Sequence, residues 1–322
     1  MSLKSFSFKT KDGFEHWINR WIPDSNPDNP EEPPKIKGVI IFNHGLAEHS
    51  MRYDRFGSIL SENGYVFNAF DMRGHGRTAE ISIQNGTGEF GKLADKNGFK
   101  LAVNDVDEIL DSLTAEYPGV PVILMAHSFG SFVAQSYIER FHGKIDACIL
   151  IGTAGPRPLL TGAGKVLAHI VKFFRGGNKP STALEAIAFG AYNNRIKDCK
   201  SPVDWLTKDQ TILELHACDA WSNIHLKIAF FCDMLDGLNL IHKKSNMAKI
   251  DKDLPIYLFY GLEDPVGDYG KTPRQLAECY RKLGIKTVVQ KEYPGDRHEI
   301  LNELDKEQVE KDILEVLDKV TG

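Results

Sequence analysis

Three residue types that together perform nucleophilic acyl transfer occur in this chain at the ends of apolar runs: a serine, an acid and a histidine. Ser128 lies in the run LMAHSFG at 124–130, between an apolar stretch and a segment with helical character. A sharp strand-to-helix turn of this kind lifts a serine hydroxyl above a sheet, and it needs small residues two before and two after the serine. Ala126 and Gly130 occupy those positions. We therefore predict that Ser128 is a nucleophile; the alternative is a serine that only caps the following helix.

A serine hydroxyl needs a base to accept its proton, and the base needs a carboxylate to orient it. In chains with such a turn, the order is serine, then acid, then histidine. Asp264 directly follows an apolar run, with Glu263 and Asp268 as competing carboxylates, and His298 lies in the later loop YPGDRHE. We expect Asp264 to orient His298. The alternatives are a turn-forming role for Asp264 and an ordinary surface position for His298.

The negative charge that develops on an acyl oxygen is stabilised by two backbone N–H groups. One donor is expected from the residue after the serine, Phe129, and the other from the loop after an early strand. That loop is 44–49 (HGLAEH), where Gly45 allows a close approach of the backbone, so Leu46 is the expected second donor. The loop lacks the carboxylate–histidine spacing of a zinc protease. We predict neither a metal nor a cofactor.

The predicted elements that position these residues alternate between strand and helix. Apolar runs predict parallel strands at 38–43, 65–70, 121–126, 145–151, 255–260 and 287–290. Helical periodicity predicts helices at 53–63, 101–117, 132–141 and 273–283, and another near the C-terminus. Strand-like runs around Asp12 and Gly13 predict an N-terminal hairpin, and a polar loop follows at 23–34. The alternation indicates an α/β fold, a mostly parallel central sheet with helices on both faces.

The alternation stops between residues 156 and 250. We expect a helical cap at 156–250, inserted between two parts of the core at 1–155 and 251–322. The cap should lie over the carboxyl edge of the sheet, where open α/β sheets bind ligands. Its many aromatic and aliphatic side chains favour a substrate with a lipophilic acyl group.

One cap segment carries an apolar helical stripe, made of Val166, Leu167, Ile170, Val171 and Phe174. The interpretation that we favour is packing of the cap onto the core. The alternative is an entrance for acyl chains that makes transient contact with membranes or micelles.

The composition is that of an ordinary globular protein. The chain has 322 residues, 42% of them hydrophobic, and a net charge of −5. This weakly acidic balance gives no electrostatic reason to expect nucleic acid as a partner. The five cysteines form no CxxC pair, and no apolar run near the N-terminus has the length of a signal peptide. We therefore expect a cytoplasmic protein with reduced thiols, and the oligomeric state stays open.

Four stretches resemble the monoacylglycerol lipase and lysophospholipase branch of the α/β hydrolases, of the serine aminopeptidase S33 type. They are HGLAEHSMRY at 44–53, FDMRGHG at 70–76, the turn around Ser128, and the pair GLEDP at 261–265 with YPGDRHE at 293–299. In addition, WLTKD at 205–209 resembles a WLSRD stretch of bacterial members. The resemblance implies the α/β-hydrolase fold. It also implies a catalytic triad and two oxyanion donors at the following positions: Ser128, Asp264, His298, Leu46 and Phe129.

By the same resemblance, Glu48 and Arg52 should lie near the alcohol side of the substrate. Ala47 and Ala126 stand where the branch has glycine, and both changes affect the shape of the pocket. The polar residues of 71–76 are expected to position the backbone of the active site and to satisfy buried groups, rather than to take part in chemistry.

The residues and the resemblance together predict a serine hydrolase. It would cleave a carboxylic ester with a lipophilic acyl group, carried by a lipid or another small molecule, through an acyl-enzyme on Ser128. One alternative is a carboxylesterase or thioesterase for small acyl substrates, because the same triad serves several bonds. An alternative from another class is a non-catalytic ligand-binding homologue, which would lack or misplace one member of the triad.

Overall fold

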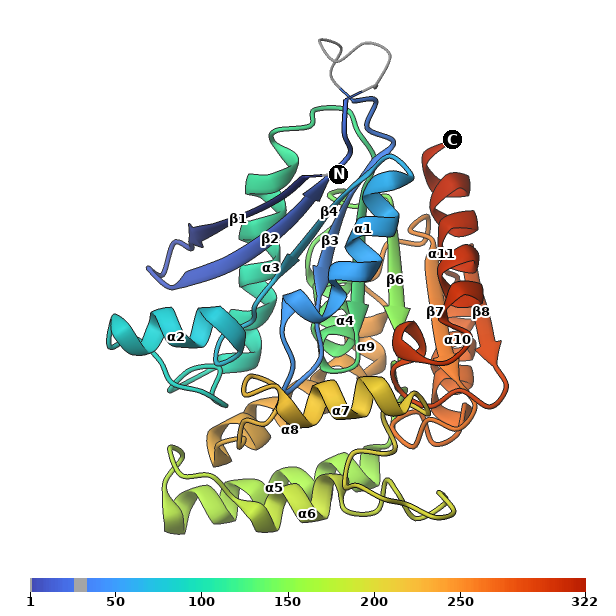
Figure 1. The fold of residues 1–322 in the computed structure, drawn as a ribbon. Helices are drawn as coiled ribbons and strands as arrows, with labels where there is room; N and C mark the ends of the chain where they lie inside the picture. The colour runs from blue at the N-terminus through green and yellow to red at the C-terminus, as the bar shows by residue number, and fades with distance from the viewer. Residues whose placement is uncertain (1, 26–33) are drawn as a thin grey trace.

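A twisted eight-stranded sheet forms the centre of the molecule (Figure 1). The computed structural model describes residues 2–25 and 34–322, so most of the predicted polar loop at 23–34 lies outside the described residues. The strands are β1 (Ser2–Lys9), β2 (Glu15–Ile22), β3 (Gly38–Asn43), β4 (Tyr65–Phe70), β5 (Val122–His127), β6 (Ala147–Ile151), β7 (Ile256–Gly261) and β8 (Val288–Tyr293).

The strands follow the order β1-β2-β4-β3-β5-β6-β7-β8. β1 pairs with β2, and β2 with β4, in antiparallel fashion, whereas every neighbouring pair from β4 to β8 is parallel. The predicted α/β fold with a mostly parallel sheet is confirmed. All residues of β3, β4, β5, β6 and β7 are buried, as expected for parallel strands covered on both faces.

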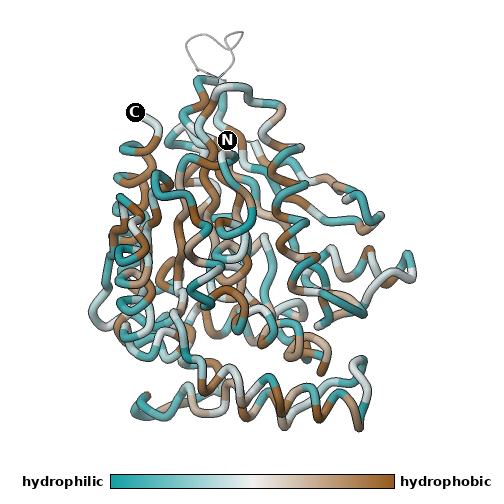
Figure 2. The backbone as a smooth tube through the Cα atoms, turned by 180° about the vertical axis from the view of Figure 1, so that it is seen from behind, coloured by the Kyte–Doolittle hydropathy of each residue, from teal (hydrophilic) through white to brown (hydrophobic). Residues whose placement is uncertain are grey.

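Two layers of helices enclose the sheet. On one face, α1 (Asp54–Glu62) and α11 (Lys306–Thr321) bury side chains such as Phe56 and Ile313. On the other, α3 (Gly98–Thr114), α4 (Phe129–Arg140) and α10 (Lys271–Lys282) bury side chains such as Val106 and Leu276. Figure 2 shows the apolar segments gathered along the central strands. The short helix α2 (Gly76–Gln84) follows β4.

Between β6 and β7 the chain forms only helices and loops, apart from one isolated β-bridge. The helices are α5 (Pro158–Arg175), α6 (Thr182–Phe189), α7 (Gln210–Cys218), α8 (Ile228–Ile241) and α9 (Lys244–Met247). Figure 1 shows α5 to α8 grouped beyond the end of the sheet to which β3 and β6 point. Local capping sets two of the starts, because the Ser181 hydroxyl accepts the N–H of Leu184 and the Asp209 carboxylate accepts the N–H of Thr211.

The predicted apolar stripe of α5 divides between two environments. Leu167, which is 38% exposed, lines a partly open cavity, and Val171 packs against the core. Val166, Ile170 and Phe174 instead face solvent, with exposed fractions of 59%, 50% and 78%. The favoured interpretation, packing onto the core, is therefore wrong for these three residues. None of the helices in the described part of the chain combines the length and hydrophobicity needed to cross a membrane.

Candidate active site

Ser128 occupies a strained turn between β5 and α4. Its φ of 50° and ψ of −121° are unusual for a residue with a side chain. The turn depends on the small residue two positions later, because a Cβ on Gly130 would lie 2.2 Å from the carbonyl oxygen of Asn43. Ala126, on the other side, is completely buried, so its methyl group fits within the core. The turn predicted from the sequence is present.

Three side chains that are far apart in the chain form one hydrogen-bonded row. The Ser128 Oγ lies 2.7 Å from Nε2 of His298, and Nδ1 of His298 lies 3.0 Å from Oδ2 of Asp264. A carboxylate can only accept hydrogen bonds, so the proton of the ring is on Nδ1, and the lone pair of Nε2 accepts the serine proton. The other oxygen of Asp264 accepts the N–H of Val266 at 2.8 Å. All three side chains are buried, which fixes their geometry.

The two competing carboxylates have other partners. Glu263 lies 3.7 Å from the ammonium group of Lys208, and Asp268 lies 3.8 Å from that of Lys271. Both carboxylates are more than one-third exposed. Asp264 is therefore the acid that the fold brings to His298.

The two predicted N–H donors flank Ser128. Phe129 is the first residue of α4, where backbone N–H groups have no partner within the helix. Gly45 brings the β3 loop so close that a Cβ there would lie 2.9 Å from the Cβ of Ser128. Among the described residues, neither Leu46 nor Phe129 has a hydrogen-bond acceptor for its N–H. Both donors are thus free to bind an oxygen beside the serine.

Glu48 and Arg52 belong to a buried polar cluster next to the site. Glu48 accepts hydrogen bonds from the Tyr53 hydroxyl at 2.9 Å and from Arg52 at 3.0 Å, and it lies 3.0 Å from Nδ1 of His127. Arg52 donates two further bonds, both 2.7 Å long, to the carboxylate of Glu299. Both predicted residues border the same cavity as Ser128, but most of their bonding capacity is used within the cluster.

In this cluster, each ionised side chain is stabilised by a neighbour of opposite charge. Burial raises the pKa of Glu48, but His127 and Arg52 outweigh it, so the net pKa lies well below the usual value. Burial lowers the pKa of His127, yet the adjacent Glu48 raises it above its usual value. Burial likewise opposes ionisation of Glu299, and Arg52 brings its pKa below the usual range. The guanidinium group therefore stays charged between two carboxylates.

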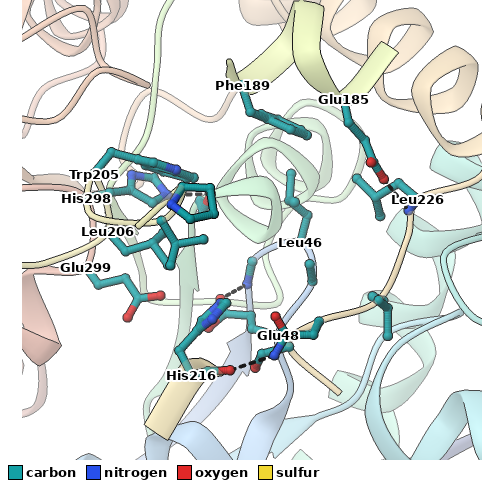
Figure 3. A pocket seen from close by; sticks show the side chains of 18 of the residues that line it. Leu46, Glu48, Glu185, Phe189, Trp205, Leu206, His216, Leu226, His298 and Glu299 are labelled. Carbon is teal, nitrogen blue, oxygen red and sulfur yellow. Dashed lines mark hydrogen bonds between the residues drawn. The ribbon is translucent and has the colours of Figure 1, made fainter. Parts of the chain in front are cut away.

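Two cavities meet at the serine. One has a volume of about 410 Å³, and its lining combines apolar side chains such as Phe189 and Leu226 with the polar residues Glu48, His216 and Glu299 (Figure 3). Arg52 also borders it. The other has a volume of about 200 Å³ and a mainly apolar lining: Phe132, Leu167, Leu184, Phe189, Phe231, Met234 and Leu235. Ser128 and Leu46 border both cavities. Ser128 thus borders both the larger cavity, where charged side chains interrupt a largely apolar lining (the polar cavity), and the smaller, mainly apolar one (the apolar cavity).

The polar residues at 71–76 form hydrogen bonds that hold the loops near Ser128 in place. Asp71 accepts hydrogen bonds from the N–H and hydroxyl groups of Ser50, and Arg73 pairs with buried Asp105 at 2.6 Å. Nε2 of His44 accepts the N–H of Met72 at 3.0 Å, and burial lowers the pKa of His44 to about 3. These side chains hold loops in place, in agreement with the structural role expected for the segment.

Three residues that neighbour the site were not predicted from the sequence to be part of it. His127 precedes Ser128, Glu299 follows His298, and Trp205 packs against His298 with ring centroids 5.0 Å apart. His127 and Glu299 could have been found from their positions in the sequence, directly beside Ser128 and His298. For Trp205, the signal was the resemblance of the WLTKD stretch to bacterial members.

Comparisons with known proteins agree with this geometry. The model of the family "Serine aminopeptidase, S33" matches residues 34–305. Monoacylglycerol lipase of Mycolicibacterium smegmatis is 29% identical over 155 residues, which make up 47% of this chain and 48% of that protein. Human monoglyceride lipase is 24% identical over 306 residues, or 91% of this chain and 86% of that protein. A thermostable carboxyl esterase from Bacillus coagulans, solved with glycerol, superimposes with a TM-score of 0.88 and 26% identity over the full length of both chains.

The family match includes every stretch that carried the resemblance in the sequence. The loop at 44–53, the turn around Ser128 and the segment 293–299 all fall within residues 34–305. The predicted relation to the monoacylglycerol lipase and lysophospholipase branch is confirmed, as is the prediction of an enzyme. The chain belongs to the serine aminopeptidase S33 family of α/β hydrolases.

Proposed function

We propose that this enzyme hydrolyses carboxylic esters through an acyl-enzyme on Ser128, with His298 as general base and Asp264 as the group that orients it. The observation that carries the proposal is the 2.7 Å contact between the Ser128 Oγ and Nε2 of His298. This distance is short enough for direct proton transfer. The names of the relatives, which include lipases and an esterase, support the same bond type.

The reaction would follow from this geometry. His298 accepts the proton of Ser128 as the serine oxygen attacks the acyl carbon, and the negative charge on the acyl oxygen is met by the N–H groups of Leu46 and Phe129. His298 then gives its proton to the leaving alcohol. A water molecule repeats the sequence on the acyl-enzyme, with His298 again as base, and releases the acid. Asp264 stabilises the imidazolium form in both halves.

The acyl group would occupy the apolar cavity. Phe132, Phe231 and Met234 line it, and in the described part of the chain no carboxylate borders it. Its volume of about 200 Å³ lies below the ~300–1,000 Å³ typical of ligand cavities. We therefore expect acyl chains of short to medium length to be the best substrates.

The alcohol would occupy the polar cavity. Its guanidinium group, on Arg52, is already neutralised by Glu48 and Glu299, and Glu185 adds a third carboxylate to the lining. Among the described residues that line this cavity, Arg52 is the single arginine, so a phosphate on the substrate would meet these carboxylates without an arginine left to pair with. We expect a neutral alcohol with several hydroxyl groups, as in a monoacylglycerol, to be preferred over the head group of an anionic lysophospholipid.

We propose that residues 156–250 act as a cap on a core formed by 1–155 and 251–322. This segment supplies Leu184, Phe189 and Met234 to the apolar cavity, so the cap would complete the acyl site. On its outer side, α5 exposes Phe173 by 83% and Phe174 by 78%. We propose that these two rings make transient contact with lipid surfaces or micelles that hold the substrate.

A second candidate is a carboxylesterase for small esters. The observation that favours it is the match to the Bacillus coagulans esterase over the full length of both chains. The small volume of the apolar cavity is compatible with it. The two candidates share the mechanism and differ in the alcohol that is released.

The test is a substrate series on the wild type and on Ser128→Ala. Monoacylglycerols of increasing chain length, matching lysophosphatidic acids and simple ethyl esters are compared by the rate of acid release. We expect neutral glycerol esters to be hydrolysed faster than anionic lysophospholipids and Ser128→Ala to be inactive on all of them. Equal rates on ethyl and glycerol esters would favour the carboxylesterase. Activity retained in Ser128→Ala would refute the mechanism.

A further inference from the structure

The loop that carries His298 is paired with a segment of the insertion between β6 and β7. The carbonyl of Trp205 accepts the N–H of His298 at 3.4 Å, and the carbonyl of Leu206 accepts the N–H of Glu299 at 2.7 Å. Two successive residues of the loop are therefore bonded to two successive residues of the segment. The main chain at His298 is therefore held by a segment of the insertion between β6 and β7.

Side chains reinforce this pairing on both sides. The guanidinium group of Arg297 donates to the carbonyls of Asp204 at 2.7 Å and Thr207 at 3.0 Å. The hydroxyl of Thr207 donates to the carbonyl of Asn302 at 2.8 Å, and Thr207 is fully buried. The segment 204–207 is thus bonded to the loop along its whole length.

The imidazole ring itself is held by a neighbouring aromatic side chain. The ring of Trp205 lies 5.0 Å from that of His298, tilted by 41° (Figure 3). Trp205 is in turn held by two contacts. The ring of Tyr192 lies 4.8 Å from the ring of Trp205, and the backbone N–H of Trp205 donates a hydrogen bond to the side-chain oxygen of Asn193 at 2.9 Å. An aromatic contact of this kind restricts rotation of the imidazole about its side-chain bonds.

We propose that Trp205 is a positioning residue for the ester hydrolysis, because its ring and carbonyl hold the imidazole of His298 against the Ser128 hydroxyl. The inference rests on the proposed function and adds to it a residue outside the hydrogen-bonded row. Proton transfer is sensitive to small errors in position, and a displacement of ~1 Å costs about 10²-fold in rate. Trp205 also borders both cavities. Because its contact with the reacting groups runs through His298, we expect its loss to affect the chemical step more than substrate affinity.

The test compares Trp205→Leu, Trp205→Phe and a matched control, Trp221→Leu. Trp221 lies in the same insertion, bonds through its indole N–H to Glu80, and borders neither of the two cavities described above. Each variant is measured on p-nitrophenyl butyrate, a small soluble ester. In Trp205→Leu we expect kcat to fall by about 10- to 100-fold with little change in KM. We expect Trp205→Phe to recover most of the loss and Trp221→Leu to match the wild type.

Three outcomes would overturn the inference: an unchanged kcat in folded Trp205→Leu, a loss confined to KM, or no recovery with phenylalanine. If Trp205→Leu does not fold, Arg297→Met provides the measurement, because it removes two bonds to the segment without touching the imidazole. Its kcat should fall with KM unchanged, and an unchanged kcat would refute the inference. Labelling of wild-type Ser128 by a fluorophosphonate separates the two claims, since failure of that reaction counts against the proposed function itself.

Discussion

The replacement Asp264→Asn tests the role of the acid through the direction of one hydrogen bond. One oxygen of Asp264 accepts the N–H of Val266 at 2.8 Å, and the other faces Nδ1 of His298 at 3.0 Å. In the variant, the amide oxygen keeps the bond to Val266, so the NH₂ group faces the imidazole. An NH₂ group is a donor, and it forces the ring proton from Nδ1 to Nε2. The imidazole then has no lone pair for the proton of Ser128.

We expect kcat in Asp264→Asn to fall by about 10⁴-fold, as a wrong tautomer does in other serine hydrolases. This loss corresponds to about 5 kcal/mol of transition-state stabilisation. The fold should persist, since the change preserves the size of the side chain. The assay is initial-rate hydrolysis of p-nitrophenyl butyrate, with thermal unfolding measured on the same samples.

Glu263→Gln is the matched control, because it removes the neighbouring carboxylate, which is half exposed and 3.7 Å from Lys208. Its kcat should equal that of the wild type. Near-normal activity in folded Asp264→Asn would refute the assignment of the acid. A large loss in Glu263→Gln would show that the wrong carboxylate had been chosen.

The remaining predictions concern stability, head-group choice and lipid contact. Burial raises the pKa of Glu139 to about 9, from an ordinary value of 4.5. Between these two pH values the folded protein keeps the proton on Glu139 and the unfolded chain releases it. The free energy of unfolding therefore falls as the pH rises from 4.5 to about 9. Glu139→Gln should therefore raise the free energy of unfolding by about 3 kcal/mol at pH 7 and have little effect at pH 4, as measured by urea denaturation; equal effects at both pH values would contradict this. Glu299→Gln removes one carboxylate from Arg52, so the ratio of activity on lysophosphatidic acid to that on monoacylglycerol should rise, and an unchanged ratio would count against the charge argument. The double variant Phe173→Ser, Phe174→Ser should bind phosphatidylcholine vesicles at least about tenfold more weakly in a sedimentation assay while keeping its rate on p-nitrophenyl butyrate; undiminished binding would exclude this face as the contact.

The core of the fold and the row of three side chains could be predicted because their signals are local. Buried parallel strands appear in the sequence as short apolar runs, and each of the three residues follows such a run or lies in the loop after it. The order along the chain then assigned Ser128, Asp264 and His298 to their places. The contacts of 2.7 Å and 3.0 Å in the structure join the same three residues.

Helix α2 could not be predicted from periodicity. Its buried positions are taken by small or polar residues, Gly76, Thr78, Ala79 and Ser82, so it has no apolar stripe. For a similar reason, the sequence places the start of α4 at residue 132, three residues later than observed. Phe129, Gly130 and Ser131 have the composition of a turn, but they form the first turn of α4, where Gly130 packs closely against Asn43 of β3.

Contacts across the fold were also beyond the reach of the sequence. Arg52 and Glu299 are 247 residues apart and still form a bidentate pair. The resemblance implied a place for Arg52 beside the substrate alcohol, and Arg52 borders the same cavity as Ser128. No pattern in the sequence indicates that its charge is shared between two carboxylates. The outward half of the α5 stripe was misjudged because helical spacing does not reveal which face meets the core.

The most direct test of the mechanism is the site of covalent labelling by a fluorophosphonate, located by mass spectrometry of the digested protein. The mechanism predicts a single phosphonyl group on Ser128, no labelling of Ser128→Ala, and much slower labelling of His298→Ala. An adduct on a different residue, or undiminished labelling of Ser128→Ala, would contradict it.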